Sequence, residues 1–355
     1  MTFSFNPPTN QAEEAAWLAW LDANRLAPIA AHKLAETQLS PSLQKHLQQA
    51  LTQARAQWLL RKLALQKLLS LTASELASPI ILLKGAALAL NLYDEPGLRL
   101  MNDIDLMAVP EDMPNVLGQM RNVYLERGLS AGNDIGYLHH FLFTDPATNI
   151  QLELHKTLPL LVDQNHLTWF LQQTETHYWK GFTFQTFTPS AQLLHLSSHA
   201  VLEHGGEQGA LAIWFYDIHK LITRWGRDID WEEILWQAKK LQWEAALHEA
   251  ISISHKLFAT PIPPAIVSWL QLPQIELSGY NVLRQMTSAH RSSSLTVFHV
   301  LRGLTWRQRG QQIFGMIFPS RNYMQRRYPH IPRLFAYPYR WFDATRKLLP
   351  ALFRR

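Results

Sequence analysis

The clearest pattern of apolar and polar residues lies between positions 80 and 109. Residues 80–83 form a short run of isoleucine and leucine, which predicts a buried strand. Small residues within 84–87 indicate a tight turn, and residues 87–93 have the composition of a helix. A proline and a glycine then end that helix within residues 94–97. Residues 103–109 begin by alternating acidic and apolar positions, which is typical of a strand with one polar face.

Periodicity along the rest of the chain predicts mostly helices. The expected helices lie at 12–23, 41–75, 110–129, 188–204, 211–225, 231–258 and 266–272, and further strands at 139–144, 149–155 and 182–187. This order predicts an α+β protein with a small mixed-sheet core. Its expected parts are an N-terminal helical region (1–76), the core (77–188), a helical domain (189–300) and a C-terminal segment (301–355).

Composition narrows the class of protein. The chain has 355 residues and 47% hydrophobic residues, enough for two or three folded domains. It contains no cysteine, which excludes disulfides, thiolate zinc sites and a cysteine nucleophile. The first residues lack a basic region followed by an apolar core. No apolar run reaches about 18 residues without a charged residue. We therefore expect neither a signal peptide nor a transmembrane segment, and a cytoplasmic location.

The acidic residues at the start of strand 103–109 are the first candidates for chemistry. Asp103 and Asp105 are two positions apart, so in a strand they project from one face, roughly 6–7 Å apart along the chain. Two such carboxylates repel each other unless a cation lies between them. Their oxygen ligands suit Mg²⁺ or Mn²⁺. The alternative is a solvent-facing strand end, because an Asp-x-Asp pair alone is common.

These residues also carry a family resemblance. Gly85-Ala86, a helix, Arg99 and Asp103-Ile104-Asp105 resemble the polymerase-β-type nucleotidyltransferase superfamily. The longer string, from Leu83 through Tyr93 to the two aspartates, resembles a largely uncharacterised bacterial branch of it. The strong match covers about thirty residues, and weaker matches continue to about residue 340. The chain departs from the superfamily in having Gly-Ala where Gly-Gly or Gly-Ser is usual.

The resemblance implies a fold, an activity and a site. It implies a nucleotidyltransferase core that transfers a nucleoside monophosphate from an NTP to an acceptor hydroxyl and releases pyrophosphate. A third carboxylate on a later strand is expected, and Glu153, within the alternating strand 149–155, matches that position. The alternative for Glu153 is an exposed edge strand. The implied metal ligands are Asp103, Asp105 and Glu153, and the implied nucleotide-binding residues are Lys84, Gly85, Ala86 and Arg99.

Four further residues are candidates for the acceptor or for the cleft. His155 and Lys156 follow Glu153, and either would contact a triphosphate or the acceptor. His199 shares a helical face with His195 and Glu203, which would line the cleft, bind a metal or be structural. Asp217 lies within an apolar helix, where an acceptor contact or base and a buried cap or ion pair are alternatives.

The function classes that stay open are an enzyme and a binding module. An enzyme would modify a small molecule, a peptide or a protein. The alternative is a nucleotide-binding regulatory or antitoxin-like module with weak or no turnover. RNA modification is disfavoured, because the chain outside its C-terminal segment is net acidic.

The C-terminal segment, residues 301–355, is strongly basic and aromatic. It holds 12 of the 33 lysines and arginines but one acid, Asp343, whereas the other 300 residues carry 21 basic and 27 acidic residues. This composition suits an anionic surface, either phospholipid headgroups or an acidic partner. Alternatively, the aromatic side chains pack against the helical domain and the arginines pair with its acids. The aromatic residues are Trp306, Phe314, Phe318, Tyr323, Tyr328, Phe335, Tyr337, Tyr339, Trp341 and Phe342.

Overall fold

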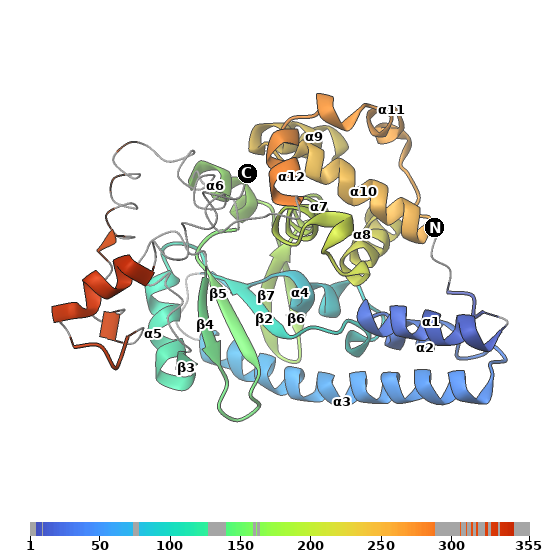
Figure 1. Ribbon diagram of the computed structural model, residues 1–355, viewed down its shortest axis with the longest axis horizontal. Helices are drawn as coiled ribbons and strands as arrows, with labels where there is room; N and C mark the ends of the chain where they lie inside the picture. The colour runs from blue at the N-terminus through green and yellow to red at the C-terminus, as the bar shows by residue number, and fades with distance from the viewer. Residues whose placement is uncertain are drawn as a thin grey trace.

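The computed structural model describes most of the chain. The described residues are 5–8, 10–73, 78–126, 140–158, 161, 164–287, 306, 310, 314, 317–318, 324–325, 328–332 and 334–343. A seven-stranded sheet lies at its centre, with a long helix along one side and a group of helices on the other (Figure 1). The expected α+β class with a mixed sheet is confirmed.

Three helices precede the sheet: α1 (Gln11–Ala23), α2 (Ala27–Lys33) and α3 (Pro41–Thr72). Two were predicted, and α2 was not. The Ser40 hydroxyl caps α3 by accepting a hydrogen bond from the backbone N–H of Leu43 at 3.3 Å, with Pro41 in the first turn. The predicted end of this helix, near residue 75, lies outside the described residues.

The seven strands of the sheet lie in the order β3-β4-β5-β2-β1-β7-β6. Parallel pairing joins β2 to β5 and β1 to β7, and the other neighbours are antiparallel. The expected strands near 80–83, 103–109, 139–144, 149–155 and 182–187 are confirmed. The strands are β1 (Ile81–Leu82), β2 (Asp103–Met107), β3 (Leu125–Glu126), β4 (His140–Thr144), β5 (Gln151–His155), β6 (Thr174–Trp179) and β7 (Phe182–Phe187).

Along the chain, the helices that separate the strands are α4 (Lys84–Asn91), η1 (Pro96–Leu98), α5 (Met113–Val123) and α6 (Gln164–Gln172). Two predictions are corrected here. The small residues at 84–87 form the first turn of α4 rather than a separate turn, because alanine and its neighbours are equally compatible with a helix. The helix expected over 110–129 is shorter, since β3 begins at Leu125; residues 127–129 lie outside the described residues.

On the side of the sheet away from α3 lies a second group of helices (Figure 1). The helix expected over 231–258 is two helices, because Gln242 adopts a left-handed conformation, with φ of 60°, that ends the first. The helix expected over 188–204 changes to a π-turn after Ser198. The elements are α7 (Pro189–Ser198), η3 (His199–Glu203), η4 (Gly206–Gln208), α8 (Ala212–Trp225), α9 (Trp231–Leu241), α10 (Glu244–Phe258), η5 (Pro264–Ile266), α11 (Val267–Leu270), η6 (Gln274–Glu276) and α12 (Tyr280–Thr287).

Two apolar clusters hold these layers together. One packs the sheet and α5 against the second half of α3, through Leu65, Leu68 and Leu69. The other joins α1, α2 and the start of α3 to α7 through α12, and it includes Ile81 and Leu83 at the strand that leads into α4. Among the described residues, no helix is long and apolar enough to cross a membrane.

Candidate active site

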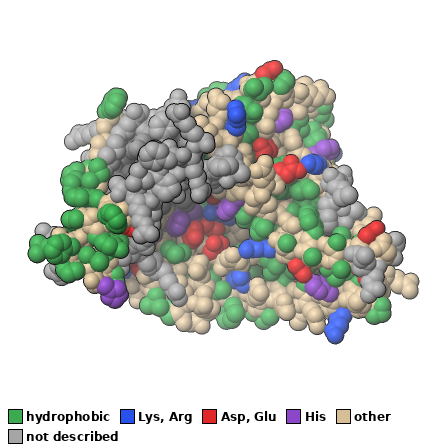
Figure 2. Space-filling view, in the orientation of Figure 1, with side chains coloured by type: hydrophobic (Ala, Val, Ile, Leu, Met, Phe, Trp, Pro, Cys, Tyr) green, Lys and Arg blue, Asp and Glu red, His purple; other side chains and the backbone are tan. Residues whose placement is uncertain are grey.

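The site begins with two parallel strands at the centre of the sheet. In the register of β2 and β5, Asp103 lies opposite Gln151, and Asp105 lies opposite Glu153. Asp103 and Asp105 share one face of β2, because side chains two residues apart in a strand point the same way. Three carboxylates are therefore brought together on adjacent strands, as the sequence predicted. Acidic and histidine side chains gather in a hollow near the middle of the face that Figure 2 shows.

Asp105 is the buried member of this group and has two cationic partners. Its Oδ1 lies 2.9 Å from Lys84 Nζ and 2.8 Å from His155 Nε2. Burial alone would raise the pKa of Asp105, but the Lys84 ammonium and the hydrogen bond from His155 hold it well below its ordinary value. The pKa of His155 is raised: burial and Lys84 lower it, and its hydrogen bonds to Asp105 and Glu153 outweigh them. Asp105 is therefore an ionised and firmly oriented carboxylate.

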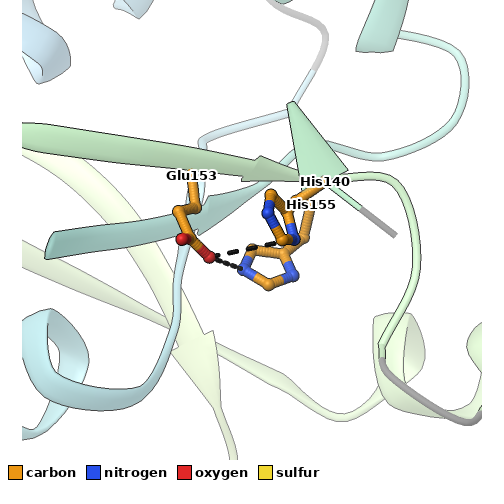
Figure 3. Close-up of side chains that lie close together, drawn as sticks. All are labelled: His140, Glu153 and His155. Atoms are coloured by element: carbon orange, nitrogen blue, oxygen red, sulfur yellow. Dashed lines mark ion pairs between the residues drawn. The ribbon is translucent and has the colours of Figure 1, made fainter. Parts of the chain in front are cut away.

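Glu153 lies beside two histidines. Its Oε2 is 3.6 Å from His155 Nε2 and 3.8 Å from His140 Nδ1, and the two imidazole rings are 5.3 Å apart (Figure 3). These three side chains also form a group whose ligand atoms are close enough to hold one cation. Sequence reasoning missed His140. The signal was the hairpin between β4 and β5, whose register places His140 opposite His155.

Asp103 has the opposite electrostatic environment from Asp105. Burial and the nearby carboxylates of Asp105 and Glu153 raise its pKa to about 6. At neutral pH, the ionised carboxylates of Asp105 and Glu153 would therefore repel that of Asp103. A bound divalent cation would remove this repulsion, and carboxylate oxygens are the donors that Mg²⁺ and Mn²⁺ prefer. The donor set thus fits the metal that the resemblance implies.

The start of α4 lies directly beside these carboxylates. Lys84 opens the helix with a φ of 44°, a left-handed conformation that costs a residue with a side chain roughly 1 kcal/mol. Burial lowers the pKa of the Lys84 ammonium, but the negative charges of Asp105 and Glu203 raise this pKa by more than burial lowers it. The ammonium therefore stays charged. Gly85 follows against Met101, where an added Cβ would lie 3.1 Å from the Met101 Cβ. Gly85 and Ala86 are both buried in the first turn.

Arg99 and Asp217 form a buried ion pair. Arg99 Nη2 lies 2.7 Å from Asp217 Oδ2, and its Nε donates to the same carboxylate at 2.8 and 2.9 Å. Tyr93 donates a further hydrogen bond to Asp217 at 2.7 Å. Asp217 is 0% exposed and Arg99 5%, so both charges of the pair are buried. Burial lowers the pKa of Arg99, but the carboxylates of Asp217 and Asp103 raise it, so Arg99 lies near the acids and its predicted nucleotide contact stays a prediction. Of the alternatives for Asp217, the structure has the ion pair.

His155 and Lys156 differ in their surroundings. His155 is 0% exposed and donates a hydrogen bond to Asp105, and its predicted contact with a triphosphate or acceptor stays a prediction. Lys156 is half-buried, with its ammonium 5.2 Å from the centre of the Phe141 ring. Burial lowers the pKa of Lys156. Its predicted contact stays a prediction.

A second polar group comes from the π-turn η3. His199 Nδ1 lies 2.6 Å from Glu203 Oε2, and the rings of His199 and His204 both pack on Trp214, at 5.0 and 4.3 Å. The helix before η3 is α7, which carries a further histidine, His195. His195 is buried, and its pKa is held well below its ordinary value by burial and then by Lys84. Lys84 and Glu203 likewise interact electrostatically. Lys84 therefore acts electrostatically on both His195 and Glu203, and a place for His199 in the cleft stays a prediction.

The chain matches the model of a known protein family and has a low similarity to a solved structure. A solved structure of an antigenic nucleotidyltransferase-like protein from Paracoccidioides brasiliensis matches 57% of this chain and 95% of that chain, with 18% identity and a TM-score of 0.31. A similarity at this level says nothing about activity. No curated protein matches the chain. The family described as uncharacterised nucleotidyltransferase matches residues 10–259, which span the sheet, the carboxylates and α3 through α10. The chain therefore belongs to this nucleotidyltransferase family.

Proposed function

We propose that the protein is a metal-dependent nucleotidyltransferase. It transfers a nucleoside monophosphate from an NTP to a hydroxyl or similar acceptor on a small molecule, a peptide or a protein, and releases pyrophosphate. One observation carries the proposal: Asp103, Asp105 and Glu153 lie in register on two adjacent parallel strands. Oriented carboxylates in this number are what in-line phosphoryl chemistry with two divalent ions requires.

Asp103, Asp105 and Glu153 would hold Mg²⁺ or Mn²⁺. When bound, such ions lower the pKa of an attacking hydroxyl and offset charge on a triphosphate. The protein's own contribution is orientation. His155 donates to Asp105 from a fully buried position, and it also lies beside Glu153, so one imidazole fixes two of the three carboxylates.

The first turn of α4 supports a place for the triphosphate. Leu83, the residue before the helix, has no polar side chain that could cap it, so backbone N–H groups of Lys84, Gly85 and Ala86 are suited to phosphate oxygens. The positive end of the helix dipole favours an anion there. Lys84 adds a charged ammonium beside Asp105.

The η3 side of the site suits the acceptor. His199 and Glu203 come from the helical part, and Glu203 is near enough to Lys84 to act on its charge. A hydroxyl that enters between α4 and η3 would meet an imidazole–carboxylate pair as well as the three acids. The complete set of acids favours an enzyme over a nucleotide-binding regulatory module.

Transfer assays with each labelled NTP would test the proposal. Purified protein is incubated with Mg²⁺ or Mn²⁺ and a cell extract, and the label is followed into protein, RNA and small molecules. Asp103→Asn is the control that should lose all transfer. Calorimetric titration of the same NTPs separates binding from turnover. Nucleotide binding without transfer for any NTP would contradict the enzyme and favour the regulatory module.

A further inference from the structure

The C-terminal segment carries a helix whose outward side is apolar. Residues 334–343 are helical, and five large apolar side chains on them are exposed. Leu334 is 89% exposed, and Phe335 and Phe342 are each 64% exposed. Tyr339 and Trp341 are also exposed. Positions 334, 335, 338, 339 and 342 share one helical face, because they recur at three- and four-residue spacing. This surface is called the apolar face below.

The opposite side of the same helix is the one that packs. Ala336 is buried, and Tyr337 and Asp343 are half-buried. Asp343 accepts a hydrogen bond from the Tyr328 hydroxyl at 3.1 Å. The helix is therefore held by its less apolar side, with its most apolar side turned outward. This is the reverse of what burial in a protein core would produce.

The aromatic side chains of the segment contact one another. Phe318 lies 5.1 Å from Phe314, 5.6 Å from Trp341 and 6.5 Å from Tyr337, measured between ring centroids. Trp341 donates its indole N–H to the Ile317 carbonyl at 2.9 Å. Neither apolar core cluster includes a described residue beyond 286. The described aromatic side chains of the segment therefore form a cluster with one another.

The apolar face occurs in the most basic part of the chain. Residues 301–355 contain 12 lysines and arginines and one acid, and that acid is hydrogen-bonded to Tyr328. Figure 2 shows hydrophobic side chains gathered at the left edge of the molecule, where Figure 1 places the red helical segments, apart from α7 to α12. An exposed apolar patch within a segment whose sequence is rich in one sign of charge is typical of an interaction surface.

We propose that this segment binds the surface of an anionic phospholipid membrane, with the apolar face of helix 334–343 in the headgroup region. Arginine and lysine attract the anionic surface, and Trp, Tyr, Phe and Leu enter the boundary between headgroups and acyl chains. Lipid fits better than nucleic acid, because Leu334, at 89% the most exposed of these side chains, is aliphatic and offers neither a charge to a phosphate nor a ring to a base. Lipid also fits better than a second copy, because two segments of this charge repel each other.

The test is co-sedimentation of the full-length protein with vesicles. Vesicles of phosphatidylcholine alone are compared with vesicles that also contain phosphatidylglycerol, at about 0.1 M and about 0.5 M salt. We expect binding to the anionic vesicles at low salt and a marked loss at high salt, where screening is stronger. Replacing two basic residues by acids, Arg346→Glu/Lys347→Glu, should weaken partitioning about 20-fold or more.

The variant Phe335→Ser/Phe342→Ser tests the apolar face itself. It should weaken partitioning about tenfold or more at unchanged net charge, since two aromatic rings no longer leave water. The matched control is Leu59→Ser/Leu63→Ser, which changes two similarly exposed residues of α3, at 58% and 57%, and should leave partitioning unchanged. Nucleotide affinity should be the same in all these variants, so the membrane proposal is tested separately from the proposed activity.

Four results would overturn the proposal. One is equal sedimentation with neutral and anionic vesicles, or none with either. A second is loss of vesicle binding in the α3 control as well. The third is a dimer in analytical ultracentrifugation that Phe335→Ser/Phe342→Ser dissociates, which would assign the apolar face to a second copy. Vesicle binding that a short RNA oligonucleotide abolishes, together with RNA binding unaffected by Phe335→Ser/Phe342→Ser, would assign the segment to nucleic acid.

Discussion

Lys84 Nζ lies 2.9 Å from Oδ1 of Asp105, and this contact separates the roles of two aspartates that the sequence presents as equivalent. With Lys84 and His155 beside it, the pKa of Asp105 is well below its ordinary value. Burial and the neighbouring acids instead raise the pKa of Asp103 to about 6. Asp105 is thus stabilised in its charged form by the protein alone, whereas a charged Asp103 is destabilised by its burial and by the neighbouring acids unless a cation is bound.

Removing the two charges should therefore change stability in opposite directions. In the absence of divalent ions at pH 7, Asp103→Asn should raise the free energy of unfolding by about 1–2 kcal/mol, because it removes a repelled carboxylate. Asp105→Asn should lower it by about 3 kcal/mol, because the Lys84 ammonium is left without its partner. Urea unfolding in EDTA measures both. Both variants should lack transfer activity, and a loss of stability in both would contradict this description of the site.

Glu153→Gln should separate turnover from nucleotide binding. Its carboxylate is expected to serve the acceptor side, so transfer should fall by at least about 100-fold while Mg²⁺–NTP affinity changes little. Single-turnover assays and calorimetric titration provide the two readouts. Glu175→Gln, on the exposed strand β6, is the matched control and should behave as the wild type. A parallel loss of binding and activity in Glu153→Gln would show that Glu153 serves the nucleotide instead.

The Arg99–Asp217 pair should act on stability rather than on catalysis. Asp217→Asn leaves a buried guanidinium without a counter-ion and should lower the free energy of unfolding by about 3–5 kcal/mol. The double variant Arg99→Met/Asp217→Leu should recover most of that loss, since neither charge stays unpaired. Denaturant unfolding of the two single variants and the double variant gives the coupling. If Asp217→Asn abolishes transfer at full stability, Asp217 contacts the substrate after all.

His219 should make stability fall toward acidic pH. Burial, then the ammonium groups of Lys33 and Lys220, lowers its pKa to about 4. The unfolded chain therefore binds this proton at a higher pH than the folded chain does, and the folded state loses stability as the pH falls from about 6.5 toward 4. Between pH 7 and pH 5 the wild type should lose about 1–2 kcal/mol more than His219→Gln does. Equal losses in the two proteins would contradict this.

The acid-bearing strands could be predicted because their pattern is local. Alternation in residues 103–109 and 149–155 fixes which side chains share a face, and parallel pairing then brings Asp105 and Glu153 together. The family resemblance supplied the expectation that a third acid, matched by Glu153, lies on a later strand. His140 could have been found by counting back through the hairpin from residue 155.

The partner of Arg99 could not be predicted in the same way. Its ion pair with Asp217 joins residues 118 positions apart. No pattern in the sequence around either residue indicates the other as its partner. The first turn of α4 was predicted as a separate turn, because small residues occur in turns and in helices alike. In the structure, Gly85 of this first helical turn packs against Met101. The edge strand β6 was missed because its residues are largely polar and exposed, so burial gave no alternation to read.

The distance along the chain between Arg99 and Asp217 has a consequence for how the protein is made in the cell. The strand with the two aspartates follows Arg99 by only four residues, but the carboxylate that neutralises Arg99 is synthesised much later, within α8. A ribosome that adds about 5–20 residues per second needs roughly 6–24 seconds for the intervening chain. During that time a nascent chain would have to bury an unpaired guanidinium to close the sheet, which is strongly unfavourable. We therefore expect the strands that carry the three acids to stay open to chaperones and proteases until α8 has left the ribosomal exit tunnel.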